Sequence, residues 1–406
     1  MMLKKFSINV LLGAIAMTLT SVASSSQTLV KVGVLNDRSG LYADLSGEGS
    51  VVAAQMAVED FKAAEKGLKV EIISADHQNK PDIGSGIVRK WYDQDGVDLV
   101  LDVPTSSVAL AVAQITRDKN KVFIDSAGGT SDLTGKACTP NTIHWTYDTW
   151  ALGNGTGSAM VKRGGDSWYF LTADYAFGHA LQRDTAEVVE KSGGKILGQA
   201  RHPLSTSDFS SFLLQAQSSK AKVIGLANAG ADTINSIKQA AEFGIVQGGQ
   251  KLAGLLVFIS DVHALGLKVS QGLVLTEAFY WDQNEGTREF SKRFAARFGG
   301  KMPTMAHAGV YAGLIHYLKA LEVIKDAKDG AKLVSKMKEM PTEDPLFGKG
   351  SVRIDGRKIH PMYLYEVKKP QDSKGEWDVY NLLATIPAEQ AFRPVDEGGC
   401  AMVTKG

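Results

Sequence analysis

The chain has few cysteines, almost no net charge and, beyond its amino-terminal segment, no long apolar run. Its 406 residues include two cysteines, and 45 Lys plus Arg stand against 44 Asp plus Glu, a formal net charge of +1. Without a basic excess or a basic run, the composition argues against a nucleic-acid-binding protein. Because no second apolar run is long enough to span a bilayer, we expect the mature chain to be soluble.

Sequence motifs of several enzyme classes are absent as well. The chain has no Gly-x-x-x-x-Gly-Lys-Ser/Thr phosphate loop, no His-Glu-x-x-His and no Gly-x-Ser-x-Gly nucleophile elbow. The glycines over 153–157 follow an aromatic segment rather than a strand, so we interpret them as close helix packing and not as a dinucleotide loop. Asp76 and His77 lack a third ligand at a suitable spacing, so neither a metal nor a cofactor is predicted.

The first residues have the pattern of a secretory signal peptide. Two lysines precede an apolar run over 10–19, and residues 21–23 form Ser-Val-Ala, a small-x-small cleavage site. The apolar run is too short for a membrane anchor, and no cysteine stands beside the cleavage site as a lipoprotein requires. We therefore expect residues 1–23 to be removed and the mature chain to reach the periplasm.

The two cysteines are Cys138 and Cys400. In an exported chain an even pair predicts a disulfide, because the compartment is oxidising. The alternative is two unrelated buried thiols, which export disfavours. A disulfide here would join the end of the chain to the region after the fourth predicted strand.

Strand and helix patterns alternate along most of the chain. Apolar residues at 30, 32 and 34 predict a strand, and apolar residues at 51, 54, 58 and 61 predict the helix that follows its loop. Further strands are predicted over 68–74, 97–101, 121–124, 167–171, 195–199, 223–227, 255–259 and 272–276. This alternation predicts parallel sheets of right-handed βαβ units, and its restart after Tyr147 predicts two lobes.

Small and hydroxyl residues follow two neighbouring predicted strands. Ser106 and Ser107 come after the third strand, and Ala127, Gly128 and Thr130 come after the fourth. Backbone amides at such helix starts favour an anion, although Ser and Thr there are also ordinary helix caps. Because the two exits share one sheet edge, we predict that they hold a carboxylate.

Aromatic residues in predicted loops form the second part of the candidate site. They are Tyr42, Tyr147, Tyr175, Phe177, Tyr280 and Trp281. One such residue is ordinary surface packing, but six spread over both halves predict a pocket with apolar walls between the lobes. Ala229, in the loop after the strand over 223–227, completes the predicted ligand-binding set.

The opening segment resembles a known family. It contains Val-Gly-Val-Leu-Asn-Asp-x-Ser-Gly-Leu-Tyr and then Gly-x-Gly-Ser-Val-Val-Ala-Ala-x-Met-Ala-Val-Glu-Asp-Phe. This is similar to periplasmic substrate-binding proteins of ABC importers, in the leucine/isoleucine/valine-binding, type I branch. Segments over 74–82, 132–135, 141–149 and 279–282 extend the resemblance to nearly all of the mature chain.

The resemblance implies an α/β fold of two Rossmann-like lobes, with parallel sheets joined by a three-stranded hinge. The chain would cross between lobes near 145–149, 276–282 and 351–355. Lobe 1 would then hold 28–145 and 282–352, lobe 2 would hold 146–281 and 353–390, and 391–406 would be a tail tied to lobe 1. Ligand would bind in the cleft, and closure would create the surface that an inner-membrane permease recognises.

The family pattern also implies roles for single residues. By position, Ser106, Ser107, Ala127 and the segment 128–130 match the place that holds a ligand carboxylate, and Tyr175 matches an aromatic that covers the ligand. The acidic residue that holds an ammonium in amino-acid binders has no clear match. Asp261 or Glu277 is a candidate, or no ammonium is bound, so an aromatic or other hydrophobic acid competes with a branched-chain amino acid as ligand.

These observations together predict a periplasmic solute-binding component of an ABC transporter rather than an enzyme. It would act as a monomer, with a small carboxylate ligand and a membrane permease as partners. A sensor module that presents the ligand to a receptor has the same fold and is the alternative. An exported hydrolase is disfavoured, because the sequence identifies no His or Asp base within reach of Ser106.

Overall fold

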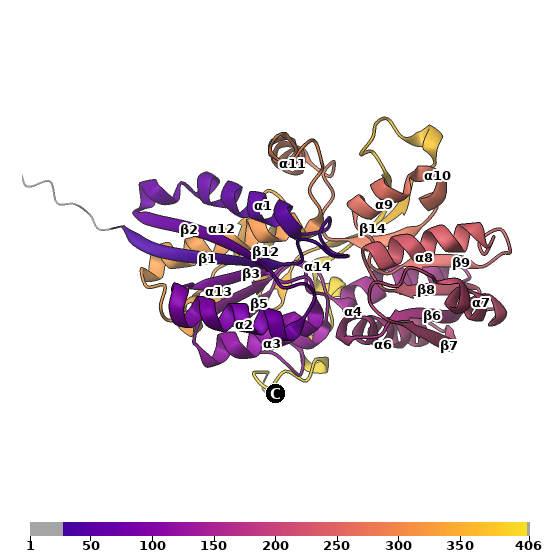
Figure 1. Cartoon of the computed structure of the whole chain (residues 1–406), viewed down its shortest axis with the longest axis horizontal. Coiled ribbons are helices and arrows are strands. Elements are labelled where there is room, and N and C mark those ends of the chain that lie inside the picture. The colour runs from indigo at the N-terminus through magenta and orange to yellow at the C-terminus, as the bar shows by residue number, and fades with distance from the viewer. Residues whose placement is uncertain (1–26, 404–406) are drawn as a thin grey trace, which may run out of the picture.

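The computed structural model describes residues 27–403, and the predicted signal peptide lies outside them. Two separate sheets lie side by side along the long axis of the molecule, each with helices on both faces (Figure 1). This confirms the predicted α/β fold with two Rossmann-like lobes. Within residues 27–403, no helix is both long enough and apolar enough to span a bilayer.

The first sheet has five parallel strands in the order β2-β1-β3-β4-β5. They are β1 (Thr28–Asn36), β2 (Leu68–Asp76), β3 (Leu99–Asp102), β4 (Val122–Asp125) and β5 (Thr142–His144). The central strands β3 and β4 are entirely buried, as their continuous apolar runs predict for a sheet covered on both faces.

Helices from two distant parts of the chain cover this first sheet. The early ones are α1 (Gly47–Phe61), α2 (Pro81–Lys90) and α3 (Ser106–Asp118), and the late ones are α11 (Glu285–Arg297), α12 (Met305–Ile324) and α13 (Gly330–Glu339). α12 packs along α1 and is buried over most of its length, which explains why its sequence is apolar on nearly every side.

The second sheet has seven strands in the order β15-β14-β10-β9-β8-β6-β7. They are β6 (Ser167–Ala173), β7 (Lys195–His202), β8 (Val223–Ala227), β9 (Lys251–Gly254), β10 (Val274–Glu277), β14 (Met362–Val367) and β15 (Tyr380–Ile386). The late strands β14 and β15 run antiparallel to their neighbours, so this sheet is mixed rather than purely parallel as predicted.

The second sheet has its own helices on both faces. They are α4 (Thr149–Leu152), α5 (Ser158–Lys162), α6 (Ala176–Lys191), α7 (Ser210–Ser218), α8 (Ala231–Glu242), α9 (Ile259–Leu265) and α10 (Leu267–Ser270). The glycines over 153–157 form a π-helical turn between α4 and α5. A Cβ on Gly155 would lie 2.3 Å from Thr276 Oγ1, which confirms that these glycines serve close packing.

The strand predicted over 255–259 is wrong. The strand β9 ends at Gly254, and α9 begins at Ile259. The Asp261 carboxylate accepts a hydrogen bond from the Phe258 amide at 2.9 Å, which stabilises the start of this helix. Periodicity does not separate a short buried strand from other buried apolar segments, and this run is buried throughout.

A small antiparallel sheet marks the last passage between the two large sheets. It contains β11 (Thr342–Asp344), β12 (Gly348–Val352) and β13 (Lys358–Ile359). The resemblance implies the third crossing near 351–355. In the structure β13 pairs with β12, and the Gly356 carbonyl accepts from the His144 amide at 2.9 Å. The chain reaches the second sheet only at β14.

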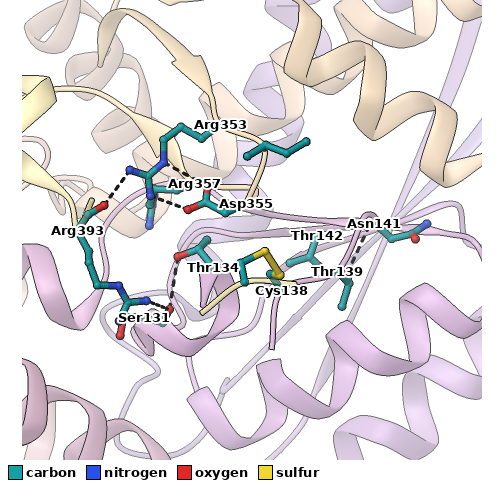
Figure 2. Close-up of a disulfide and its surroundings, with 12 residues drawn as sticks. Ser131, Thr134, Cys138, Thr139, Asn141, Thr142, Arg353, Asp355, Arg357 and Arg393 are labelled. Carbon is teal, nitrogen blue, oxygen red and sulfur yellow. Dashed lines mark hydrogen bonds and ion pairs between the residues drawn. A yellow bond between two sulfur atoms is a disulfide. The ribbon is translucent and has the colours of Figure 1, made fainter. Parts of the chain in front are cut away.

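The predicted disulfide between Cys138 and Cys400 is present, with 5.6 Å between the two Cα atoms (Figure 2). Beside it, Arg393 Nη2 donates to the Ser131 carbonyl at 3.1 Å. Arg353 Nη1 donates to the Arg393 carbonyl at 2.8 Å. The end of the chain, which includes α14 (Ala388–Ala391), is therefore held against the segment after β4 by covalent and polar contacts.

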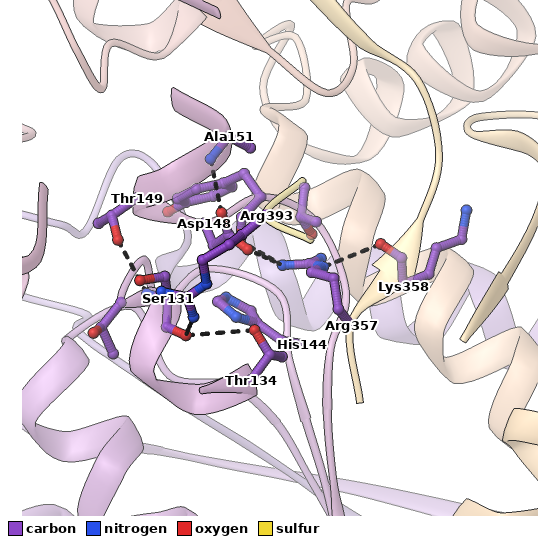
Figure 3. A network of polar contacts seen from close by, with 12 residues as sticks. Ser131, Thr134, His144, Asp148, Thr149, Ala151, Arg357, Lys358 and Arg393 are labelled. Carbon is purple, nitrogen blue, oxygen red and sulfur yellow. Dashed lines mark hydrogen bonds and ion pairs between the residues drawn. The ribbon is translucent and has the colours of Figure 1, made fainter. Parts of the chain in front are cut away.

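A buried arginine links two of the crossings (Figure 3). Arg357 has no exposed surface, and its Nη1 donates to the Tyr147 carbonyl at 2.9 Å and lies 3.5 Å from an Asp148 carboxylate oxygen. Burial lowers the pKa of Arg357 to about 10, so the side chain stays charged at neutral pH. His360 Nε2 lies 2.8 Å from the Thr146 carbonyl, and this contact adds a second link between the same two segments.

We expect reduction of the disulfide to destabilise the protein. The crosslink joins residues 262 positions apart, and its loss frees the unfolded chain, so the free energy of unfolding should fall by about 2–5 kcal/mol. Urea unfolding with and without dithiothreitol measures the change. A double variant, Cys138→Ser with Cys400→Ser, should have the same free energy of unfolding as the reduced protein, and dithiothreitol should not change it. Equal stability of all three forms would contradict the prediction.

Candidate functional site

The carboxyl edges of the two sheets face one another, and the loops that follow the strands meet between them (Figure 1). The Tyr42 hydroxyl, from the loop after β1, lies 2.6 Å from the Tyr175 hydroxyl, from the loop after β6. The Ala231 amide at the start of α8 donates to the Leu41 carbonyl at 3.2 Å. The lobes are therefore in direct contact at this edge, as in a closed clamp.

The loop that carries Tyr42 is organised by one carboxylate. Asp37 accepts hydrogen bonds from the Gly40 amide at 2.7 Å, the Tyr42 amide at 2.9 Å and Asn79 Nδ2 at 2.6 Å. Asn79 in turn accepts from the Thr105 hydroxyl. An aspartate commonly folds a loop in this way by bonding backbone amides a few residues ahead. The loops after β1, β2 and β3 thus form one polar unit.

Four of the six predicted aromatic residues gather at this edge. Tyr175 and Phe177 have ring centroids 6.0 Å apart, and Tyr147 packs edge-on against Phe258 at 6.0 Å. A Cβ on Gly129 would lie 2.6 Å from a Phe177 ring carbon and 3.5 Å from one of Tyr147. With Tyr42, these rings form an apolar cluster with contributions from both lobes. Phe258 was missed because its segment was interpreted as a strand.

Tyr280 and Trp281 lie elsewhere. The Tyr280 hydroxyl and the Trp281 indole nitrogen both donate to the Trp377 carbonyl, at 3.0 and 2.7 Å. Tyr280 also packs on Tyr365 and Tyr380 of the last two strands. They belong to a core cluster of the second lobe that is separate from the one holding Tyr42 and Tyr147, so we do not retain them as ligand contacts.

The backbone amides predicted to hold a ligand carboxylate are already occupied. The Ala127 and Gly128 amides donate to Asp125 Oδ1 at 3.1 and 2.6 Å, and the Thr130 amide donates to the Ser106 hydroxyl oxygen at 3.1 Å. Burial raises the pKa of Asp125 well above its usual value. The aspartate at the end of β4 therefore satisfies its own exit loop, a competition that the sequence prediction overlooked.

Hydroxyl groups at the start of α3 remain available. Ser106 is buried and accepts one hydrogen bond, which leaves its hydroxyl hydrogen to donate. Ser107 is half-buried and makes no side-chain hydrogen bond to the described residues. Thr130 instead accepts from the Asp132 amide, so its oxygen caps the short helical turn that follows. The hydroxyl groups of Ser106 and Ser107 are therefore available to donate at this sheet edge.

Two acidic residues considered for an ammonium are buried near one another in the second lobe. Burial raises the pKa of Asp261 to about 7. The pKa of Glu277 lies well above its usual value. Burial is the larger cause, and the nearby charge of Asp261 is the smaller one. One Glu277 oxygen accepts from the Tyr380 hydroxyl at 3.4 Å, and the other has no protein partner in the described chain. This pair lies beside the aromatic cluster, since the Phe258 amide donates to Asp261 and the charge of Glu277 acts on Tyr147.

Asp232 is a further acidic residue that the sequence prediction did not select. It lies in the first turn of α8, almost fully buried, and one oxygen accepts from the Ser205 amide at 3.1 Å. Burial raises the pKa of Asp232 to about 6. Burial is also the main cause of the raised pKa of Tyr42 and of Tyr175, and the charge of Asp232 adds to both increases. It is therefore close to the contact between the lobes. Within residues 27–403, no three potential ligands gather as a metal site.

The contact between Leu41 and the start of α8 requires a glycine. Gly230, which follows the predicted Ala229, has φ 58° and ψ −135°, a backbone conformation that favours glycine. A Cβ there would lie 2.3 Å from the Leu41 carbonyl oxygen and 3.0 Å from a Tyr42 ring carbon. Both the conformation and the space therefore exclude a side chain at this position in the closed form.

Two lobes that meet over a shared aromatic cluster, with a hinge on one side, define a two-lobed ligand-binding protein. Comparison with known proteins agrees: residues 29–376 match the family model described as periplasmic binding protein. The chain belongs to the periplasmic binding protein family. This membership confirms the predicted family and the expectation of a protein that is not an enzyme. A search of curated proteins found no match.

Solved structures support this assignment. A periplasmic binding protein from Burkholderia mallei is 50% identical, with a TM-score of 0.90, and the match covers 94% of this chain and 100% of that chain. A branched chain amino acid ABC transporter periplasmic ligand-binding protein from Burkholderia xenovorans is 40% identical, with a TM-score of 0.82 and coverage of 92% and 99%. An R. palustris solute-binding protein in complex with benzoate, 21% identical with a TM-score of 0.80 and coverage of 92% and 99%, shares the fold.

We expect Gly230→Ala to weaken ligand binding by about tenfold, because the added methyl group obstructs the approach of Leu41 and costs roughly 1–3 kcal/mol in the closed form. Gly249→Ala is the matched control, since Gly249 also has a positive φ, 99°, but nothing lies within 4 Å of its Cβ position. Isothermal titration of both variants with the same ligand checks the prediction. Equal affinities would show that the contact at Gly230 does not support closure.

Proposed function

We propose that this chain captures a small apolar carboxylate between its lobes and delivers it to an inner-membrane ABC permease. The observation that carries the proposal is the aromatic cluster closed by the Tyr42–Tyr175 contact, since each lobe supplies part of one enclosed wall. The predicted signal peptide, which lies outside the described residues, and the family membership support a periplasmic location. The similarity to a branched chain amino acid transporter protein at 40% identity supports the ABC permease as partner.

The proposed binding mode divides the ligand between the two lobes. Ser106 and Ser107 at the start of α3 would donate to the ligand carboxylate, where the helix dipole also favours negative charge. Tyr147, Tyr175 and Phe177 would cover the apolar body of the ligand. Closure of the clamp around the ligand would bring the two lobe surfaces that face the membrane into the arrangement that the permease recognises.

Two classes of ligand fit this description, and they differ at one end. A branched-chain or other hydrophobic amino acid carries an ammonium, and Asp261 with Glu277 would neutralise it. An aromatic carboxylic acid has no ammonium, and Glu277 would stay protonated and Asp261 partly protonated in their buried site, as their raised pKa values favour. The aromatic walls suit both classes.

We expect Tyr175→Ala to weaken ligand binding strongly and Ser107→Ala to weaken it by about fivefold to tenfold, because the first removes a wall and the second a single hydrogen bond. A thermal-shift screen over hydrophobic amino acids and aromatic acids finds the ligand first, since ligand at roughly 100 times its Kd adds about 2.7 kcal/mol of stability. Tyr280→Phe is the control, because Tyr280 lies in the separate cluster. Unchanged binding by both Tyr175→Ala and Ser107→Ala would overturn the placement of the site.

Proton release should distinguish the two ligand classes. At pH 7 an acid with a pKa of about 7 is half protonated, so an adjacent ammonium, which lowers that pKa, should expel about half a proton or more on binding. An aromatic carboxylate brings negative charge and should expel none. Isothermal titration in buffers of different ionisation enthalpy measures the protons released.

The variant Asp261→Asn is the control for this measurement. For an amino acid ligand it should reduce both the affinity and the proton release, whereas for an aromatic acid it should change neither greatly. Proton release that persists unchanged in Asp261→Asn would show that another group titrates, and would contradict the assignment of Asp261 to the ammonium end.

A further inference from the structure

A cavity of about 730 Å³ lies in the second lobe, far from the contact between the lobes. It is bounded by the first residues of β9 and β10, the end of α8, the end of β14 and the helix α10. The carboxyl ends of the parallel strands face the first lobe, so this cavity is at the opposite edge of the sheet. It shares no residue with the aromatic cluster, and no function described above uses it.

The floor of this cavity is apolar, and polar and charged residues border it. Met160, Ile237, Leu273 and Val274 are buried and form its floor. Val246 and Val269 border it with 51% and 39% of their surface exposed. A ligand that covered these two valines would remove apolar surface from water, which stabilises a complex in proportion to the area buried. The volume is within the range of small-molecule sites, about 300–1,000 Å³.

The rim of the cavity carries an excess of positive charge. Arg163, Lys251 and Lys268 border it, against the single carboxylate of Glu366. Glu366 is paired with Arg163 at 3.0 Å. Lys251 Nζ contacts only the Arg163 carbonyl, at 3.4 Å, and Lys268 has no carboxylate within 4.0 Å in the described part of the chain. Two ammonium groups are therefore left to attract an anion beside an apolar floor.

We propose that this cavity is a second ligand site, which binds an amphipathic monoanion with an apolar body and one carboxylate or sulfonate. The body would lie on Ile237 and Leu273, and the anionic group would lie between Lys251 and Lys268. A polyanion could place its charges only at the rim, because the floor residues Met160, Ile237, Leu273 and Val274 are apolar. This site is independent of the cleft, so each can be occupied without the other.

The fluorescent monoanion 1-anilinonaphthalene-8-sulfonate tests the proposal, with octanoate as a competitor. We expect saturable binding at one site on the folded native protein and displacement by octanoate. Charge reversal in Lys251→Glu with Lys268→Glu should weaken the dye by about tenfold, and added salt should weaken it in the native protein. Ala241→Trp, which places a large side chain at the half-buried end of α8 in the cavity, should abolish binding.

Two controls separate this site from other causes. Lys292→Glu changes an exposed charge on α11 of the first lobe and should leave the dye affinity unchanged. Tyr175→Ala, which alters the proposed cleft site, should also leave it unchanged. Near-ultraviolet circular dichroism confirms that each variant is folded, since this dye also binds loosened proteins. Absence of saturable binding, or equal affinity in the native protein and in both cavity variants, would overturn the proposal.

Discussion

The contact between Tyr42 and Tyr175 holds the two lobes together over the candidate site. Each hydroxyl has the other lobe's hydroxyl as partner, at 2.6 Å, and Tyr42 is almost fully buried. When the lobes separate, each hydroxyl would exchange this partner for water, so the contact favours the closed form only modestly. The contact also depends on Asp37, which holds the Tyr42 loop, and on Gly230, which leaves room for it.

On the hinge side of the molecule, buried polar side chains connect the segments. There, backbone atoms of the first and third crossings are linked by Arg357 and His360, and Arg357 is a buried charge with a carboxylate 3.5 Å away. Removing one member of such a buried pair costs several kcal/mol, because it leaves the other charge buried without a counter-charge. The cleft side has few direct bonds between lobes, which suits a contact that must open to admit ligand.

Much of the architecture followed from local sequence patterns. The apolar runs of β3 and β4 and the strand–helix alternation predicted parallel sheets, because period and turn residues are local properties. The Cys138–Cys400 pairing followed from count and compartment alone. The error at 255–259 has the opposite cause: the segment is buried on all sides, so its periodicity carries no information.

The candidate site was predicted only in part. Tyr42, Tyr147, Tyr175 and Phe177 do come together, because loops after parallel strands gather at one sheet edge. Tyr280 and Trp281 come from the same kind of sequence context, yet they pack into the second lobe beside Trp377. Whether a loop aromatic faces the cleft or its own core depends on neighbours that are distant in sequence.

The sequence by itself determined the two α/β lobes, the disulfide and the sheet edge at which the aromatic loops gather. These features follow from the hydrophobic period, the residues after each strand and the number of cysteines, which are properties of the sequence alone. Only the tertiary structure decided which polar groups are free. Asp125 occupies the Ala127 and Gly128 amides, and Asp261 and Glu277 become neighbours, because hydrogen bonding and burial depend on residues brought together by folding.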